Sequence, residues 1–158
     1  RNVIKTPIAL GERVLDRSLF LKYLLNNTVD IIQPDVTNCR GISEAKKIAE
    51  LADLFGIEVA FHNAFGPIQT AATLNIDLTI PNFLIQESFE LSWPEWKKKL
   101  LTSGYSLEDG YFVMNNKPGL GIEINEKVLE EYRIKGKMEL FDSNAPSWVV
   151  KDTFKSKK

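Results

Sequence analysis

The chain has one cysteine, one histidine and nearly balanced charge, with 20 basic and 21 acidic residues and a formal net charge of −1. A single cysteine, Cys39, forms no internal disulfide, which favours a reducing compartment and a cytoplasmic location. No apolar run approaches the ~18 residues that a membrane-spanning helix needs. The charge balance offers no basic face for nucleic acid and no polybasic patch for a membrane. These absences predict a globular chain that binds neither.

The 158 residues fit one domain, and the start of the chain predicts neighbouring sequence. The opening Arg1-Asn2-Val3 has no initiator methionine and no apolar segment typical of a signal peptide. The first expected strand follows almost at once. We therefore expect that something upstream is missing.

Apolar runs of strand length alternate with helical patterns through the first ninety residues. The expected strands are 8–10, 29–33, 57–61 and 83–86, and the expected helices are 17–26, 44–55 and 68–74. Pro34 is expected to end the second strand, Ser43 to cap the second helix and Gly56 to end it. This alternation predicts an α/β fold with parallel strands and right-handed crossovers.

The pattern changes after residue 90. Short helices are expected at 93–99, with Pro94 at the first helical position, and at 126–132. Turn signals at 109–110 and 117–119 flank an extended segment at 111–114. Pro118-Gly119-Leu120-Gly121 has no following Lys-Ser/Thr, so it predicts a tight turn rather than a phosphate loop. The basic end, 155–158, is expected to be solvated.

Four chemically able side chains end the four apolar runs: Glu12, Asp35, His62 and Glu87. They follow one another at intervals of 23, 27 and 25 residues, which is the length of one strand, one loop and one helix. Enzymes built on a β/α barrel place their catalytic residues at the carboxyl ends of successive strands. The spacing therefore predicts half of a barrel active site.

His62 is the strongest candidate, although a lone histidine on a strand more often has a structural role. Asp35 ends the preceding strand at an equivalent height. Since neighbouring parallel strands lie about 4.8 Å apart, its carboxylate should reach one ring nitrogen of His62. A His–Asp pair at a barrel mouth is a candidate general acid or base. Cys39 has no histidine nearby in the sequence, so it is not expected to be a nucleophile.

Glu12 and Glu87 are weaker candidates, because an acid at a strand end is usually exposed or salt-bridged. Glu12 follows Gly11, whose lack of a side chain lets a ligand approach the backbone. A carboxylate there suits Mg²⁺, which prefers oxygen ligands. The functional alternative for Glu87 is an acid that donates a hydrogen bond to a developing oxyanion.

Six motifs in order carry a family resemblance. They are Ala9-Leu10-Gly11-Glu12-Arg13, Gln33-Pro34-Asp35, Gly41-Ile42-Ser43, Val59-Ala60-Phe61-His62-Asn63, Asn82-Phe83-Leu84-Ile85-Gln86-Glu87 and Lys117-Pro118-Gly119-Leu120-Gly121. Together they resemble the C-terminal half of the enolase superfamily, mandelate-racemase (muconate lactonizing) subgroup. Segments 62–66 and 147–151 resemble archaeal-type gluconate dehydratases in particular. The likeness covers nearly the whole chain.

The resemblance implies strands five to eight of a (β/α)7β barrel in residues 1–100. It implies that residues 101–158 pack on a capping domain that lies, with the other half of the barrel, outside this chain. Glu12 would be the third carboxylate ligand of Mg²⁺, Asp35 and His62 the catalytic dyad, and Glu87 the hydrogen-bonding acid. The implied reaction is dehydration of a sugar acid, D-gluconate above all, to a 2-keto-3-deoxy acid, by a homo-oligomer.

Two alternatives stay open. The enzyme could be another acid-sugar dehydratase or a racemase that uses the same enolate. The chain could also be a non-catalytic half-barrel, since four strands alone leave two open edges and one carboxylate is a poor Mg²⁺ site. The family often has Gly-Gly where this chain has Arg40-Gly41. If the first position needs a positive φ, Arg40 is strained.

Overall fold

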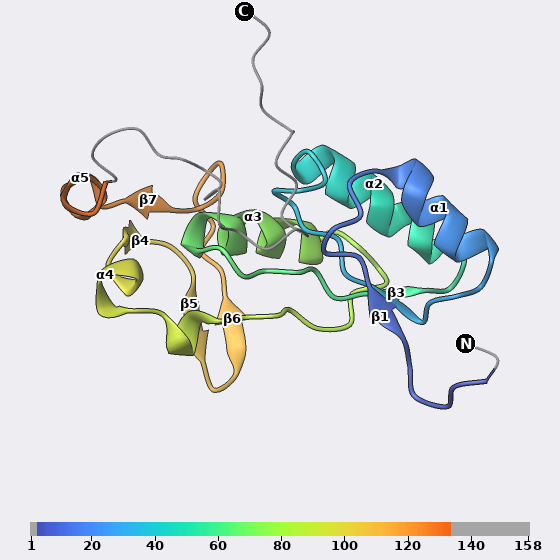
Figure 1. Cartoon of the computed structure of the whole chain (residues 1–158). Coiled ribbons are helices and arrows are strands. Elements are labelled where there is room, and N and C mark those ends of the chain that lie inside the picture. The colour runs from blue at the N-terminus through green and yellow to red at the C-terminus, as the bar shows by residue number, and fades with distance from the viewer. Residues whose placement is uncertain (1–2, 134–158) are drawn as a thin grey trace, which may run out of the picture.

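Strands and helices alternate through the first half of the computed structural model, which describes residues 3–133 (Figure 1). The elements in this half are β1 (Ala9–Leu10), α1 (Arg17–Leu25), β2 (Ile31–Ile32), α2 (Ile42–Asp53), β3 (Glu58–Val59) and α3 (Pro67–Asp77). The three strands form one parallel sheet in the order β1-β2-β3. The predicted α/β alternation is confirmed. Segment 147–151 and the basic end 155–158 lie outside the described residues.

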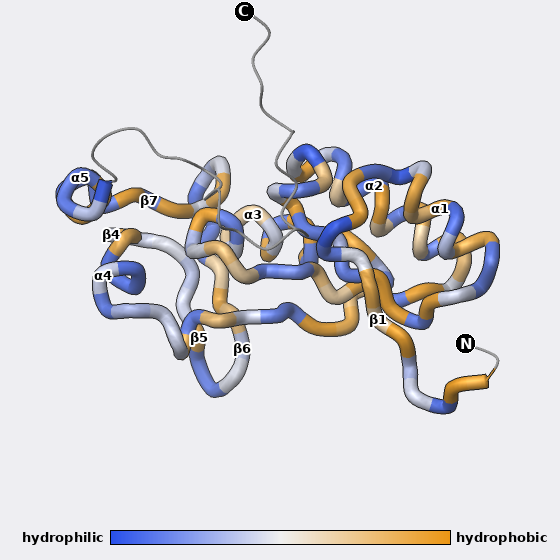
Figure 2. Tube along the Cα trace, viewed as in Figure 1, coloured by the Kyte–Doolittle hydropathy of each residue, from blue (hydrophilic) through white to orange (hydrophobic). Residues whose placement is uncertain are grey.

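The main core lies between this sheet and its helices. Ile32 and Val59 are fully buried, and they cluster with Phe20 of α1, Ile48 of α2 and Ile76 of α3. Burial of each such side chain contributes about 1.5–3 kcal/mol. In Figure 2, hydrophobic stretches follow the strands, whereas α1 and α2 alternate between hydrophobic and hydrophilic residues. The helices therefore cover one face of the sheet.

The other face of the sheet is more open within residues 3–133. Ala9, Ile31 and Glu58 lie side by side in the register, and Ala9 and Glu58 are exposed while Ile31 is half-buried. We expected the second strand to be buried on both faces. Among the described residues this holds only on the side of the helices.

The helix ends follow local chemistry. The Asp16 carboxylate accepts hydrogen bonds from the backbone N–H groups of Ser18 (2.9 Å) and Leu19 (3.2 Å), which caps α1. The prediction of Ser43 as the cap of α2 is wrong, because Gly41 is the cap residue and Ser43 already lies in the helix. The Gly41 carbonyl accepts the first helical bond, from Ala45 (3.0 Å). The helix ends at Asp53 with Leu54 as its cap residue, two residues before the predicted end, and Gly56, with a φ of +63°, lies in the turn that follows.

Strand pairing is shorter than predicted. Pro34 lacks an N–H and interrupts β2, but its carbonyl accepts from His62 N–H (3.0 Å), and pairing resumes at an Asp35–His62 bridge. The expected strand at 83–86 is reduced to a bridge between Phe83 and Val59. Further along, the Gln86 side chain, rather than the backbone, donates to the Phe61 carbonyl (3.2 Å).

The second half of the described chain is built from small antiparallel pairs, gathered at the left of Figure 1. Its elements are a 3-10 turn η1 (Glu90–Ser92), α4 (Glu95–Lys98), β4 (Leu101–Ser103), β5 (Ser106–Glu108), β6 (Tyr111–Val113), β7 (Glu123–Ile124) and α5 (Glu126–Glu131). β4 pairs with β7, and β5 pairs with β6 around the predicted Asp109-Gly110 turn. Pro94 is the cap residue of α4 rather than its first helical residue. No helix in the described part is long and apolar enough to cross a membrane.

Candidate active site

The loop after β1 carries Glu12 into the site. Gly11 has a φ of +151°, and a Cβ there would lie 2.7 Å from the backbone N and C atoms of Gln33. The group that makes this close approach is the neighbouring strand, while the approach of a ligand to Gly11 stays a prediction. The Glu12 carbonyl accepts from the Asn38 side-chain amide (2.9 Å), which joins this loop to the loop after β2. Glu12 presents a side chain that is 58% exposed.

Asp35 is completely buried just beyond β2. Its Oδ1 atom accepts from Thr37 N–H (2.7 Å), the Thr37 hydroxyl and Asn38 N–H (3.1 Å). Such a turn lets a carboxylate bond the backbone that follows it. All the hydrogen bonds of Oδ1 are therefore made within the loop that carries Asp35, and Oδ2 faces the third strand.

Oδ2 of Asp35 contacts the imidazole of His62. The Nδ1 atom of His62 lies 2.6 Å from Asp35 Oδ2, and its Nε2 atom lies 3.4 Å from Glu12 Oε2. A carboxylate only accepts, so Nδ1 carries the proton and Nε2 faces the more open side of the site. The contact predicted between Asp35 and His62 is therefore present, and Glu12 joins it.

Glu87 joins the group through the backbone of Asn63 rather than through the His–Asp pair. Its Oε2 atom accepts from Asn63 N–H (2.9 Å), and its carbonyl accepts from the Asn63 side-chain amide (3.0 Å). Asn63 is 1% exposed, and its side-chain amide donates to the Thr70 hydroxyl on α3 (3.0 Å). Glu12, Asp35 and His62 thus meet at the carboxyl end of the sheet, and Glu87 is joined to them through Asn63, which follows His62. This is the edge that the sequence spacing predicts.

Sequence reasoning missed the residues that hold this group in place. Asn63, Gln69 and Thr70 are buried polar side chains, and each bonds a predicted site residue or its neighbour. Their signal in the sequence is the placement of Gln69-Thr70 in the first turn of a helix that directly follows the His62 loop. A polar pair in that position needs partners, since buried polar groups are nearly always hydrogen-bonded.

The predicted Mg²⁺ site is not complete within the described residues. Among residues 3–133, no group of three or more His, Cys, Asp or Glu side chains is placed to hold a metal ion. Asp35 has already committed its oxygens to hydrogen bonds. The Glu12 carboxylate is exposed and can serve as a ligand, but one carboxylate does not make a Mg²⁺ site by itself.

Two neighbouring groups need no role in catalysis. Arg40 stands where the family often has glycine, and its φ is +74°. A side chain in this left-handed region is strained, at a cost on the order of 1 kcal/mol. Cys39 is buried, and burial together with the negative Asp35 raises the pKa of its thiol to about 11. Its thiolate is therefore scarce at neutral pH, consistent with the expectation that it is no nucleophile.

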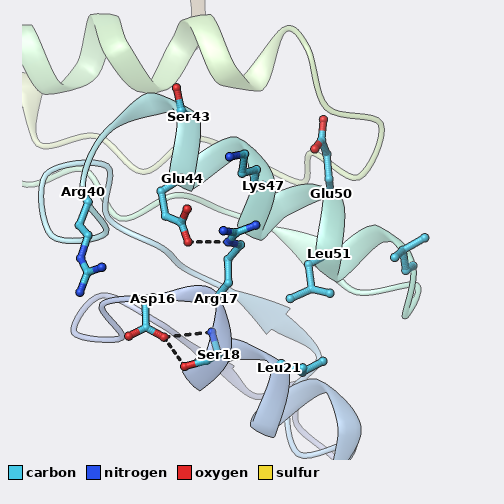
Figure 3. A pocket seen from close by; sticks show the side chains of 11 residues that line it. Asp16, Arg17, Ser18, Leu21, Arg40, Ser43, Glu44, Lys47, Glu50 and Leu51 are labelled. Atoms are coloured by element: carbon cyan, nitrogen blue, oxygen red, sulfur yellow. Dashed lines mark hydrogen bonds and ion pairs between the residues drawn. The ribbon is translucent and has the colours of Figure 1, made fainter.

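A hollow of about 1020 Å³ lies away from this group, between α1 and α2 (Figure 3). Its charged side chains are of both signs, and Arg17 bonds Glu44 across it (Nε–Oε1 2.7 Å). None of the four predicted site residues lines it. We therefore assign it no part in the candidate site.

Comparison with known proteins defines the family. Residues 1–128 match the family model described as Enolase C-terminal domain-like, and the chain belongs to this family. It is 55% identical over 155 residues to the D-gluconate/D-galactonate dehydratase of Picrophilus torridus, which is 98% of this chain and 39% of that protein.

Solved structures agree. A mandelate racemase/muconate lactonizing enzyme from Jannaschia sp. superposes with a TM-score of 0.77 and 33% identity, over 85% of this chain and 34% of that one. An enolase from Pantoea ananatis with bound D-gluconate and Mg superposes with a TM-score of 0.78 and 32% identity, over 87% of this chain and 33% of that one. The chain thus spans well under half the length of the proteins that it matches.

Proposed function

We propose that this chain supplies the acid–base half of the active site of a sugar-acid dehydratase, a hydro-lyase of the enolase superfamily. The observation that carries the proposal is the contact of 2.6 Å between His62 Nδ1 and Asp35 Oδ2, with Glu12 against the other ring nitrogen. A relative with 55% identity is named a D-gluconate/D-galactonate dehydratase. D-gluconate is our first candidate substrate, and D-galactonate is the second.

In this proposal residues 1–100 form strands five to eight of a (β/α)7β barrel. Residues 101–158 pack on a capping domain, and both that domain and the other barrel half lie elsewhere in a longer, homo-oligomeric enzyme. The open face of the sheet and the outer edge of β1, which pairs with no strand within residues 3–133, support this arrangement, because such edges are normally covered or paired. The proposal also rests on the fraction of each relative that the chain covers.

Dehydration removes the proton from C2 of the acid and the hydroxyl from C3, as water. His62, oriented by Asp35, exchanges a proton through Nε2: it takes the C2 proton or protonates the departing hydroxyl. Glu87 hydrogen-bonds the substrate carboxylate in its enolised form. The enol product then becomes the 2-keto-3-deoxy acid.

Mg²⁺ belongs to the proposal as a cofactor of the complete enzyme. Glu12 would be one of its ligands, and the others would come from outside residues 3–133. When bound, the ion would stabilise negative charge on the substrate carboxylate. The residues of this chain alone do not hold it, so we expect the 158-residue chain by itself to be inactive.

The test is an assay of 2-keto-3-deoxy acid formation from a panel of sugar acids with Mg²⁺ present. It is run on the 158-residue chain and on an enzyme in which the sequence that precedes the matched region in the relatives has been restored. Activity only in the restored enzyme supports the proposal and names the substrate. Turnover by the chain alone would contradict the proposal that it holds only half of the active site. A folded restored enzyme that converts no sugar acid would contradict the proposal that the enzyme is a sugar-acid dehydratase.

A further inference from the structure

We infer that Gln69 is a positioning residue of the proposed dehydratase, one that holds the Asp35–His62 pair in its reactive geometry without touching the substrate. This inference rests on the proposed function. It adds a role for a residue on a helix that carries none of the four candidate site residues. The observations that support it are three hydrogen bonds and the burial of the amide.

Gln69 lies in the first turn of α3 and is 5% exposed. Its Nε2 atom donates to Asp35 Oδ2 (3.0 Å) and to the His62 carbonyl (3.2 Å). Its Oε1 atom accepts from Phe65 N–H (2.7 Å). One amide therefore joins the buried aspartate to both ends of the loop that carries the histidine.

The direction of the Gln69 amide is fixed by its partners. The backbone N–H of Phe65 can only donate, so the side-chain oxygen must face it, and Nε2 must face Asp35. Asp35 Oδ2 is then shared by Gln69 Nε2 and His62 Nδ1, while Oδ1 is held by the turn that follows. Without Gln69, the oxygen that orients His62 would keep His62 as its one hydrogen-bond partner within residues 3–133, and the turn would hold the carboxylate only through Oδ1.

This difference affects catalysis because proton transfer depends on alignment. A displacement of about 1 Å at a reacting group can reduce a rate on the order of 10²-fold. Removal of the Gln69 amide also leaves the buried Asp35 carboxylate with one donor fewer, so the carboxylate and the imidazole can shift together. We expect the loss in the turnover rate kcat, with KM little changed, since Gln69 is 5% exposed and both ends of its amide bond other groups of the protein.

Thr73 provides a matched control. It lies one turn further along α3 and is also fully buried, but its hydroxyl donates only to the Gln69 backbone carbonyl (2.9 Å). Thr73→Val therefore removes a buried polar group from the same helix without removing a contact to the dyad. Gln69→Leu removes all three bonds of the amide. Gln69→Glu keeps the shape and the acceptor for Phe65 while it replaces the donor that faces Asp35.

The first readout needs no activity. His62 is the only histidine, so its imidazole N–H signal in an NMR spectrum of the isotope-labelled 158-residue chain is assigned without ambiguity. In the wild type and in Thr73→Val we expect one tautomer, with a slowly exchanging proton on Nδ1. In Gln69→Leu and Gln69→Glu we expect that signal to broaden or to exchange faster. An unchanged signal in a folded Gln69 variant would overturn the inference, as would a wild type without a protonated Nδ1.

The second readout is the kinetics of the restored enzyme. We expect kcat to fall on the order of 10²-fold in the Gln69 variants, with KM little changed, and to be retained in Thr73→Val even if that variant melts at a lower temperature. Equal losses in Thr73→Val and Gln69→Leu would show a merely structural role and overturn the inference. A wild-type enzyme without dehydratase activity would refute the proposed function, while the NMR result would still decide the role of Gln69.

Discussion

Asp77 is the last residue of α3, and its burial predicts a pH-dependent penalty on stability. Asp77 is 9% exposed. Among the described residues, neither of its carboxylate oxygens has a hydrogen-bond partner. Burial disfavours the charged form and raises the pKa of Asp77 from 3.8 to about 7. Asp77→Asn replaces the carboxylate with a neutral side chain of nearly the same shape.

The sign follows from proton linkage. The unfolded chain ionises Asp77 near pH 4, whereas the folded chain keeps the proton until about pH 7. Between these values the folded state binds more protons, so stability falls as pH rises. At 1.36 kcal/mol per pKa unit, the loss above pH 7 is at most roughly 4 kcal/mol.

The measurement is urea unfolding of the wild type and Asp77→Asn from pH 4 to pH 8. We expect the two free energies of unfolding to be similar at pH 4 and the variant to become more stable as pH rises, with a plateau above pH 7. Asp53 is the matched control, because it also ends a helix but is exposed. Asp53→Asn should change stability by no more than about 0.5 kcal/mol at any pH. A difference for Asp77→Asn that is independent of pH would refute the reasoning.

Three further predictions follow from the site and its surroundings. Gly11→Ala should destabilise the chain by roughly 1–3 kcal/mol in urea unfolding, because its Cβ would meet the Gln33 backbone at 2.7 Å; an unchanged midpoint would contradict the close approach. Asp35→Asn should keep the melting temperature within a few degrees but reduce the turnover of the restored enzyme on the order of 10²-fold or more, since an amide cannot hold a protonated Nδ1 as a carboxylate does. Cys39 should react slowly with a thiol reagent at pH 8 and fast once the chain is unfolded, because burial raises its pKa to about 11; equal rates would show that the thiol is accessible in the folded chain.

The positions of the helices were largely predictable from the sequence, whereas their caps were not. The expected range 17–26 differs by one residue from the observed Arg17–Leu25, but the Asp16 cap of this helix was not predicted and the cap of α2 was wrongly placed at Ser43. The Asp35–His62 contact was also predictable. Parallel strands bring their carboxyl ends to the same edge, so a regular spacing along the chain becomes proximity in space.

The parts that depend on distant partners were not predictable. β4 pairs with β7 across a separation of about twenty residues, and nothing in either three-residue or two-residue strand encodes that choice. Segment 83–86 was expected to be a strand, but the Gln86 side chain takes a bond that a ladder would have used. The role of Gln69 depends on Asp35, 34 positions earlier, which no periodicity of the helix reveals.

In the proposed function His62, held by Asp35, either takes the C2 proton of a sugar acid or protonates the departing C3 hydroxyl. The most direct measurement compares wild-type and His62→Asn forms of the restored enzyme with D-gluconate and Mg²⁺ in D₂O, following 2-keto-3-deoxy acid formation together with deuterium uptake. We predict that His62→Asn keeps the circular dichroism and melting temperature of the wild type but loses dehydration. Turnover near that of the wild type in His62→Asn would contradict the claim and leave His62 with a structural role.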